Sequence, residues 1–279
     1  MTNSVKFTKM QGLGNDFIIM DAAEAQKSSS GYSSLAEKIC DRKFGVGADG
    51  LIIVNPEDMW ANTDICWRIL NSDGSEPQMC GNGIRCFAKY VHDRGLVKNK
   101  KFTINTLAGI IIPEILDNQE VKVDMGVPVF SPERIPLAAE SNIIEVKGRK
   151  FEFNAVSMGN PHCVIFTQED TAALALEYGA EIEKHQYFPE KTNVEFVKII
   201  SRDRIRIDVW ERGCGITLAC GTGACASGVA AIKNSLVNNR LTAELPGGEL
   251  QIEWKNSSED NSVFMTGKSE YVFYGEYLL

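Results

Sequence analysis

Apolar residues along this chain recur mainly with the period of two that is typical of half-buried β-strands. Residues 204–209 alternate as Arg-Ile-Arg-Ile-Asp-Val, which predicts a strand through residue 210 with one buried and one solvated face. Residues 1–21 are interpreted as a strand followed by a turn at Gly12-Leu13-Gly14. Short apolar segments predict further strands at residues 17–20, 51–54, 65–70, 121–125, 151–156, 194–200, 250–254 and 271–274.

Helical patterns occupy less of the chain than strand patterns. Two of them are residues 33–42, which begin at a Ser cap, and the Ala-, Leu- and Glu-rich residues 171–184. Residues 224–232 are small and apolar on nearly every side, which predicts a wholly buried helix. A fourth helix follows Cys80 and stops at Gly95, and its apolar residues at i, i+3, i+4 and i+7 predict an amphipathic helix: Ile84, Phe87, Ala88 and Val91.

The chain also contains an internal repeat. Met79-Cys80-Gly81-Asn82-Gly83 is echoed 140 residues later by Ala219-Cys220-Gly221-Thr222-Gly223. Asn71 and Glu211 each stand nine residues before their cysteine, and a Gly-Asn turn beside an apolar strand occurs at both Gly14-Asn15 and Gly159-Asn160. Three matches in the same order favour duplication over chance.

These patterns predict an α+β protein with two pseudo-symmetric lobes, each a curled, mostly antiparallel sheet around a central helix. The seam is placed near residues 127–132, because three prolines between Pro128 and Pro136 interrupt regular structure there. The predicted domains are residues 1–128, which carry Cys80, and residues 129–269, which carry Cys220. The C-terminal strand at residues 270–279 is a candidate to return to the first lobe.

Composition and charge narrow the class of protein. The chain has 279 residues, of which 44% are hydrophobic and 24% charged, so it can bury a sizeable core without disulfide staples. A net charge of -8 with scattered Lys and Arg disfavours nucleic acid as a partner. No apolar run approaches the roughly 20 residues that span a membrane, and the N-terminus does not have the pattern of a signal peptide. We therefore expect a cytoplasmic or other reducing location.

The eight cysteines supply the candidate chemistry. Six of them, with Cys86, Cys214 and Cys225 the nearest to the motifs, are interpreted as buried thiols. Cys80 and Cys220 differ, because each precedes a Gly-X-Gly turn that opens a helix, where N–H groups and partial positive charge accumulate. That position predicts a lowered thiol pKa and a cradle for a carboxylate.

Two such sulfurs facing one bound amino acid would invert its α-carbon without a cofactor. One thiolate would remove the α-proton, and the opposite thiol would deliver a proton to the other face. Amides aimed at the substrate carboxylate would stabilise the charge that develops on it.

Two other functional interpretations of the same residues are disfavoured. The spacings Cys80-x5-Cys86 and Cys214-x5-Cys220-x4-Cys225 fit no common zinc pattern, and the chain has only three histidines, so no metal is expected. Residues 45–50 match a dinucleotide fingerprint, but a helical pattern precedes them and a strand follows. That order is the reverse of what the fingerprint needs, and NAD is rejected.

The motifs together resemble the diaminopimelate epimerase family. The pair of cysteine strings, with Glu211-Arg212-Gly213 at its spacing, carries most of the resemblance. The matching segments run along most of the chain, at residues 12–17, 44–50, 71–75, 79–83, 158–162, 211–215 and 218–223.

The resemblance implies a role for each matching residue. Cys80 and Cys220 would be the catalytic acid and base, with His162 in a supporting place. Arg212 would bind the distal carboxylate and Glu211 would meet an ammonium group. The remaining substrate-binding residues implied are the amides of Gly81, Asn82, Gly221 and Thr222 and the side chains of Asn15, Asn71, Asn160 and Asn193.

The implied reaction interconverts LL- and meso-diaminopimelate in lysine biosynthesis, with no pyridoxal phosphate or other cofactor. Diaminopimelate is then the small-molecule partner, in a cleft between lobes that close to expel water, and a homodimer is left open. Gln11, Gly50 and Ile216 depart from residues frequent in the family, and Gly50 and Ile216 keep a broader amino-acid racemase as an alternative. A cysteine-based redox or metal-binding protein is the second alternative.

Overall fold

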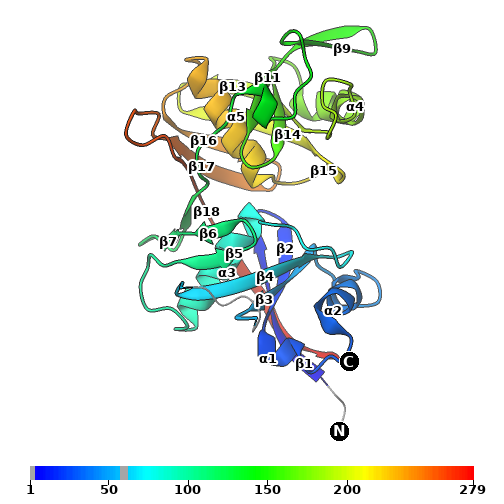
Figure 1. The fold of residues 1–279 in the computed structure, drawn as a ribbon, viewed down its shortest axis with the longest axis vertical. Coiled ribbons are helices and arrows are strands. Elements are labelled where there is room, and N and C mark those ends of the chain that lie inside the picture. The colour runs from blue at the N-terminus through cyan, green and yellow to red at the C-terminus, as the bar shows by residue number, and fades with distance from the viewer. Residues whose placement is uncertain (1–3, 57–61) are drawn as a thin grey trace. The chain divides into compact units, whose positions relative to one another are not determined.

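The computed structural model describes residues 4–56 and 62–279 (Figure 1). The chain divides into two compact units. The first is Met1–Val123 together with Gly267–Leu279, and the second is Asp124–Thr266. Each unit carries one of the two cysteine strings, Cys80 in the first and Cys220 in the second.

The first unit is built on a sheet of seven strands in the order β19-β1-β2-β3-β4-β5-β6. Its strands are β1 (Ser4–Gly12), β2 (Asn15–Asp21), β3 (Gly50–Val54), β4 (Ile65–Asn71), β5 (Ile104–Thr106), β6 (Gly109–Ile111) and β19 (Glu270–Leu278). A hairpin of β7 (Pro113–Ile115) and β8 (Val121–Asp124) follows β6 in the chain. The helices are α1 (Ala22–Ala25), α2 (Gly31–Cys40) and α3 (Gly81–Asp93).

The second unit has a mixed sheet that runs β11-β12-β13-β14-β16-β17-β18, with β15 paired to β14. Its strands are β11 (Asn154–Ser157), β12 (Pro161–Phe166), β13 (Asn193–Ser201), β14 (Arg204–Glu211), β15 (Gly215–Ile216), β16 (Arg240–Leu245), β17 (Gly248–Trp254) and β18 (Val263–Gly267). A separate two-stranded sheet holds β9 (Ile143–Val146) and β10 (Arg149–Glu152). The helices are η2 (Pro132–Arg134), α4 (Thr171–Glu183) and α5 (Gly221–Lys233).

The two units repeat the same order of strand pairing, which confirms the predicted duplication. In the first unit the pairs from β1 to β6 are antiparallel, parallel, antiparallel, parallel and antiparallel. The series from β11 to β17 is identical, with β16 and β17 in the places of β5 and β6. Strands, helices and cysteines therefore have counterparts that can be compared position by position.

Strand alternation allows helices to pack on both faces of each sheet. On one face of the first sheet, Ile18 and Leu51 pack with Leu35 and Ile39 of α2. Cys163 and Phe196 of the second sheet pack in the same way with α4. The opposite faces meet α3, which contacts β1 and β2, and α5, which contacts β12, β13 and β14. The central helix expected in each lobe is present (Figure 1).

One prediction about secondary structure is confirmed and another needs correction. The helix after Cys80 is amphipathic as predicted, with Lys89, His92 and Asp93 on its less buried side, but its first two turns are fully enclosed, and even Arg85 has no exposed surface. Its guanidinium donates hydrogen bonds to the Gly81 carbonyl and the Asn82 side chain, which makes burial of the charge tolerable. The strand expected at residues 151–156 is two strands, because the chain leaves β10 after Glu152 and enters β11 at Asn154.

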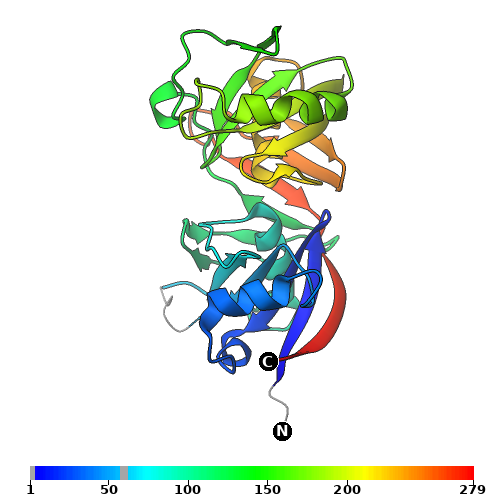
Figure 2. The same ribbon diagram turned by 90° about the vertical axis from the view of Figure 1, so that its right-hand side faces the viewer.

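The C-terminal strand lies at the edge of the first unit's sheet. β19 pairs antiparallel with β1, from Ser4 opposite Leu278 to Gln11 opposite Glu270. Figure 2 shows these two strands, blue and red, side by side.

None of the helices within residues 4–56 and 62–279 is long and apolar enough to cross a membrane.

Candidate active site

Each of the two cysteines caps a helix. Cys80 is the N-cap of α3, with φ -139° and ψ 115°, and its sulfur accepts the Gly83 N–H at 3.4 Å. Cys220 is the N-cap of α5, with φ -117° and ψ 111°, and its sulfur accepts the Gly223 N–H at 3.4 Å. The thiol therefore takes the place of the Ser, Thr, Asp or Asn side chain that usually caps a helix.

The Cys80 cluster brings together three residues that the sequence indicated. The Asn15 Oδ1 atom, at the start of β2, lies 3.8 Å from the Cys80 sulfur and accepts a hydrogen bond from Asn82 Nδ2 at 3.3 Å. Asn15 Nδ2 donates to the Asp49 carboxylate at 2.5 Å, and Arg85 donates to Asn82 Oδ1 at 2.9 Å. Both amide side chains are therefore held in fixed orientations next to the thiol.

Asn71 ends β4 in the same unit. It lies opposite Gly50 in the strand register, and its side-chain amide donates to Ser75 Oγ at 2.9 Å. A Cβ atom added at Gly50 would come 2.7 Å from the Leu70 carbonyl oxygen. A larger residue at position 50 would therefore need the neighbouring strand to shift.

The Cys220 cluster follows the same plan with different side chains. The Cys220 sulfur lies 3.5 Å from Thr222 Oγ1, which accepts from Asn160 Nδ2 at 3.3 Å. Asn160 Oδ1 lies 2.9 Å from His162 Nε2, and His162 Nδ1 lies 2.7 Å from Glu195 Oε1. A hydrogen-bonded chain thus runs from the thiol into the core of the second unit.

The Cys220 thiol contradicts the expectation of a lowered pKa. Burial raises the pKa of Cys220 well above its usual value, and the carboxylates of Glu211 and Glu195 raise it further. The hydrogen bonds from Thr222 and the Gly223 amide act in the opposite direction but do not outweigh these effects. Desolvation and two nearby carboxylates are thus stronger than the helix N-terminus at this position.

Glu211 belongs to the same cluster. Its carboxylate accepts from Thr217 Oγ1 at 2.5 Å and forms a side-chain hydrogen bond with Cys220. Burial raises the pKa of the Glu211 carboxyl, while those two hydrogen bonds lower it.

Asn193 and Arg212 are tied to each other through the backbone. Asn193 is buried, and its side chain donates to the Pro161 carbonyl at 2.9 Å and accepts the Arg212 N–H at 2.9 Å. The exposed guanidinium of Arg212 donates to the Glu190 carbonyl at 3.2 Å. Asn193 therefore fixes the backbone from which Arg212 projects.

Sequence reasoning missed Asp49, Arg85 and Glu195. Asp49 and Arg85 orient Asn15 and Asn82, and Glu195 lies behind His162. Glu195 carried a signal in the sequence, since it is an acid in the otherwise apolar run Val194-Glu195-Phe196-Val197. An ionisable residue within a buried strand indicates a specific partner.

The other cysteines are thiols too, but one of them is not where it was expected. Cys86 and Cys225 are buried, whereas Cys214 is exposed. The reason is its place in the turn between β14 and β15, where Gly213 and Gly215 both have positive φ.

Within the described ranges, no group of three His, Cys, Asp or Glu side chains is arranged to hold a metal ion.

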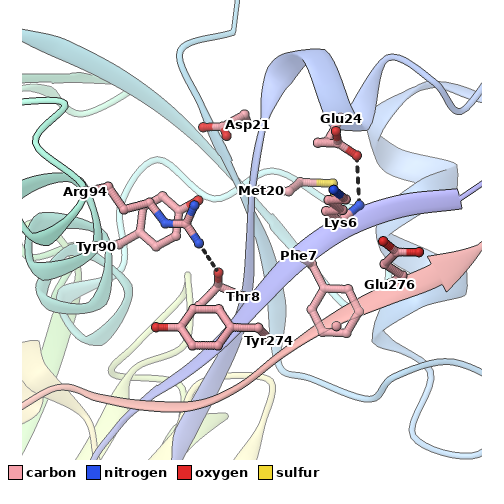
Figure 3. A pocket seen from close by; sticks show the side chains of 11 residues that line it. Lys6, Phe7, Thr8, Met20, Asp21, Glu24, Tyr90, Arg94, Tyr274 and Glu276 are labelled. Carbon is pink, nitrogen blue, oxygen red and sulfur yellow. Dashed lines mark hydrogen bonds between the residues drawn. The ribbon is translucent and has the colours of Figure 1, made fainter.

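The first unit also contains a hollow of about 430 Å³ beside β1, β2, α3 and β19. Figure 3 shows Arg94 in it, next to Tyr90, with its guanidinium bonded to Thr8. None of the sequence-predicted site residues lines this hollow. It is therefore separate from the two cysteine clusters.

Comparison with known proteins identifies the family. A sequence model of the family described as diaminopimelate epimerase matches residues 7–131 and 154–272. A diaminopimelate epimerase of Desulfitobacterium hafniense is 50% identical over 97% of this chain and 97% of its own length. One from Carboxydothermus hydrogenoformans is 50% identical over 99% of this chain and 100% of its own length.

Solved structures extend the likeness of fold to more distant proteins. A Bacillus anthracis phenazine biosynthesis protein of the PhzF family gives a TM-score of 0.71 at 17% identity, covering 99% of both chains. A hydroxyproline epimerase from Agrobacterium vitis gives 0.69 at 13% identity, covering 100% of this chain and 94% of its own. The two-lobed α+β fold predicted from the sequence is confirmed by these neighbours and by the family match.

Proposed function

The chain belongs to the diaminopimelate epimerase family, and on that basis we propose that Cys80 and Cys220 move the α-proton of the substrate. Its activity is the epimerisation of diaminopimelate, a step of lysine biosynthesis. The observation that carries the assignment of residues is the pair of thiols at the first turns of equivalent helices in a duplicated fold.

The reaction needs a base on one face of the α-carbon and an acid on the other. One thiolate takes the α-proton and becomes a thiol, while the opposite thiol gives up its proton to the carbon and becomes a thiolate. The product has inverted configuration, and the enzyme ends with the protonation states of its two sulfurs exchanged. The two thiols serve the two directions of the reaction in opposite roles.

The first turns of α3 and α5 are proposed to hold the reacting carboxylate. In each helix the first intrahelical hydrogen bond comes from the fourth residue after the cap, from Ile84 to the Cys80 carbonyl and from Ala224 to the Cys220 carbonyl, both at 2.9 Å. The amides of Gly81 and Asn82 come before Ile84 in the first turn of α3, and those of Gly221 and Thr222 come before Ala224 in the first turn of α5. Such N–H groups and the helix dipole favour the negative charge that grows on the carboxylate as the proton leaves.

The remaining polar residues are proposed to recognise the rest of the substrate. The side chains of Asn15, Asn71 and Asn160 lie at strand ends of their units and offer amide groups for hydrogen bonds. Arg212 is exposed and suited to a bidentate contact with a distal carboxylate, while Glu211 offers a carboxylate to an ammonium group. Asn193 is proposed to support substrate binding by fixing the backbone at Arg212.

The test is incubation with LL-diaminopimelate in heavy water, followed by proton NMR. We expect the α-proton signal to disappear as the meso product forms with deuterium at the inverted carbon. Folded, reduced protein that exchanges no α-proton would refute the proposed proton transfer. A panel with glutamate and other mono-amino acids, turned over equally well, would instead support the broader racemase.

A second copy of the chain is proposed to pair along β19. This strand lies at the end of its sheet and exposes Val272, Tyr274 and Leu278 to 51%, 64% and 65%. An exposed edge strand with apolar side chains is a template for pairing with another strand. A homodimer would cover both the edge and these side chains.

A further inference from the structure

Glu195 is a fully buried carboxylate for which the proposed reaction has no use. It lies on β13 with no exposed surface, and its Oε1 atom is 2.7 Å from His162 Nδ1. Its Oε2 atom is also buried and has no hydrogen-bond partner among the described residues. Burying a carboxylate in this way is costly, so its place calls for an explanation beyond packing.

The carboxylate lies next to the Cys220 thiol. A Cβ atom added at Gly223 would come 2.7 Å from Glu195 Oε1 and 3.2 Å from the Cys220 sulfur, which places those two atoms no more than about 6 Å apart. Gly223 is also the residue whose N–H the sulfur accepts. Because position 223 has no side chain, the Glu195 carboxylate and the Cys220 sulfur can both lie close to this residue.

The Cys80 cluster has an apolar side chain at the equivalent position. Phe17 pairs with Gly50 across β2 and β3 just as His162 pairs with Asn193 across β12 and β13. Two residues further along, the counterpart of Glu195 is Ile52. The equivalent helix glycines support this correspondence. A Cβ atom added at Gly83 would come 3.5 Å from Ile52 Cδ1, whereas one added at Gly223 would meet Glu195 Oε1.

The two repeats therefore have the same capping cysteine but different residues at the equivalent strand positions beside the helix start. Under Cys80 the pair is Phe17 and Ile52, whereas under Cys220 the pair is His162 and Glu195. His162 has an oxygen at each ring nitrogen, Glu195 Oε1 at 2.7 Å and Asn160 Oδ1 at 2.9 Å. These two contacts hold the imidazole between the carboxylate and Asn160.

We propose that Glu195 is a positioning residue that holds His162 and keeps Cys220 protonated in the free enzyme, which leaves Cys80 to supply the first thiolate. This inference rests on the proposed two-thiol reaction, which must start with one sulfur protonated and the other ionised. The charged and titratable side chains that face Cys220 are Glu195 from β13 and Glu211 from β14, with His162 from β12 behind Asn160. The raised pKa of Cys220 agrees with this arrangement.

The test measures the reactivity of each thiol without substrate. Wild-type protein and Glu195→Gln are treated with iodoacetamide at pH 8, and alkylation of Cys80 and Cys220 is followed by mass spectrometry of their peptides. Because a carboxylate within about 6 Å opposes thiolate formation, we expect Cys220 in Glu195→Gln to react about tenfold faster or more, while Cys80 keeps its rate. Comparing the same thiol between variants removes the difference in exposure between the two sites.

The matched control is Asp208→Asn, which makes the same chemical change at another buried carboxylate of the second unit. Asp208 accepts from Thr171 Oγ1 at 2.6 Å on β14 and is not bonded to His162. It should leave both alkylation rates unchanged. If Glu195→Gln is poorly folded, Glu195→Asp keeps the charge and should keep Cys220 slow.

A second readout follows the imidazole itself. In protein labelled with ¹⁵N-histidine, Glu195→Gln should shift the ring ¹⁵N resonances of one of the three histidines, because the bond from His162 Nδ1 to the carboxylate is changed, whereas Asp208→Asn should leave all three where they are. An unchanged Cys220 rate in Glu195→Gln, or equal acceleration of both thiols, would overturn the proposal and leave Glu195 a packing residue. Loss of epimerisation in Cys80→Ala and Cys220→Ala tests the two-thiol reaction separately, so each idea can fail without the other.

Discussion

At the scale of single residues, the two cysteine strings carried most of the functional information. A thiol followed by Gly-X-Gly at a helix start is a local pattern, and both copies stand at the start of the predicted helix, where the structure adds that the sulfur accepts a backbone N–H at 3.4 Å. The reactivity of the sulfur was not local. Burial and two carboxylates from other strands raise the pKa of Cys220, and neither effect can be read from the residues around position 220.

Replacement of either thiol tests the proposed roles directly. Cys80→Ala and Cys220→Ala should each lower the rate of epimerisation by about 100- to 10,000-fold, because a two-base inversion loses its acid or its base. The measurement is turnover of LL-diaminopimelate under reducing conditions. Cys225→Ala, a change to another buried thiol on α5, serves as the control and should keep most of the activity. Full activity in both site variants would rule out the two-thiol reaction.

At the scale of elements, the starts of α3 and α5 look alike in sequence but have different neighbours. A Cβ at Gly83 meets the flexible end of Ile69 at 3.1 Å, whereas a Cβ at Gly223 would come 2.7 Å from Glu195 Oε1. The sequence predicted both helices, α3 from its apolar periodicity and α5 from a continuous run of small apolar residues. It could not predict that α3 is enclosed, since enclosure depends on how the sheet curls around it.

This difference predicts unequal effects of the same substitution. Gly223→Ala should lower the stability of the fold by about 1–3 kcal/mol, because the carboxylate and the capping sulfur must both move. Gly83→Ala should cost less, because the Ile69 side chain can adjust. The two variants are compared by urea unfolding and by turnover, and a larger loss in Gly83→Ala would contradict the packing described for Gly223.

At the scale of the whole molecule, buried thiols make stability depend on pH. Burial raises the pKa of Cys40 and of Cys86 to about 12 from 9.0. Above pH 9 the unfolded chain releases these protons while the folded chain retains them, so stability is fully present below pH 9 and falls as pH rises towards 12.

The expected slope is about 1.4 kcal/mol per pH unit for each thiol in that range. It is measured from the free energy of unfolding in urea between pH 8 and pH 11 in the presence of a reducing agent. Cys86→Ala should lower the overall stability but flatten the slope. A slope that is the same in wild type and variant would show that Cys86 does not contribute.

If two copies pair along the exposed edge strand β19, the protein is a dimer in solution. Light scattering with size-exclusion chromatography should give twice the chain mass of 30.8 kDa. The double variant Val272→Lys with Tyr274→Lys should give the mass of one chain, because charge on an edge strand opposes pairing. Leu176→Lys changes an equally exposed residue of the second unit and should remain a dimer. A wild-type protein that elutes as a single chain would end this proposal.

The sequence by itself determined the duplication, the cysteines at the helix starts and the family. Those features are repeated strings and local periodicities, which survive without knowledge of how distant segments pack. Only the tertiary structure decided that Glu195 and His162 lie beneath Cys220 while Ile52 and Phe17 lie beneath Cys80. That difference arises because strand register and helix packing bring together residues that are far apart in the chain, and electrostatic effects follow distance in space.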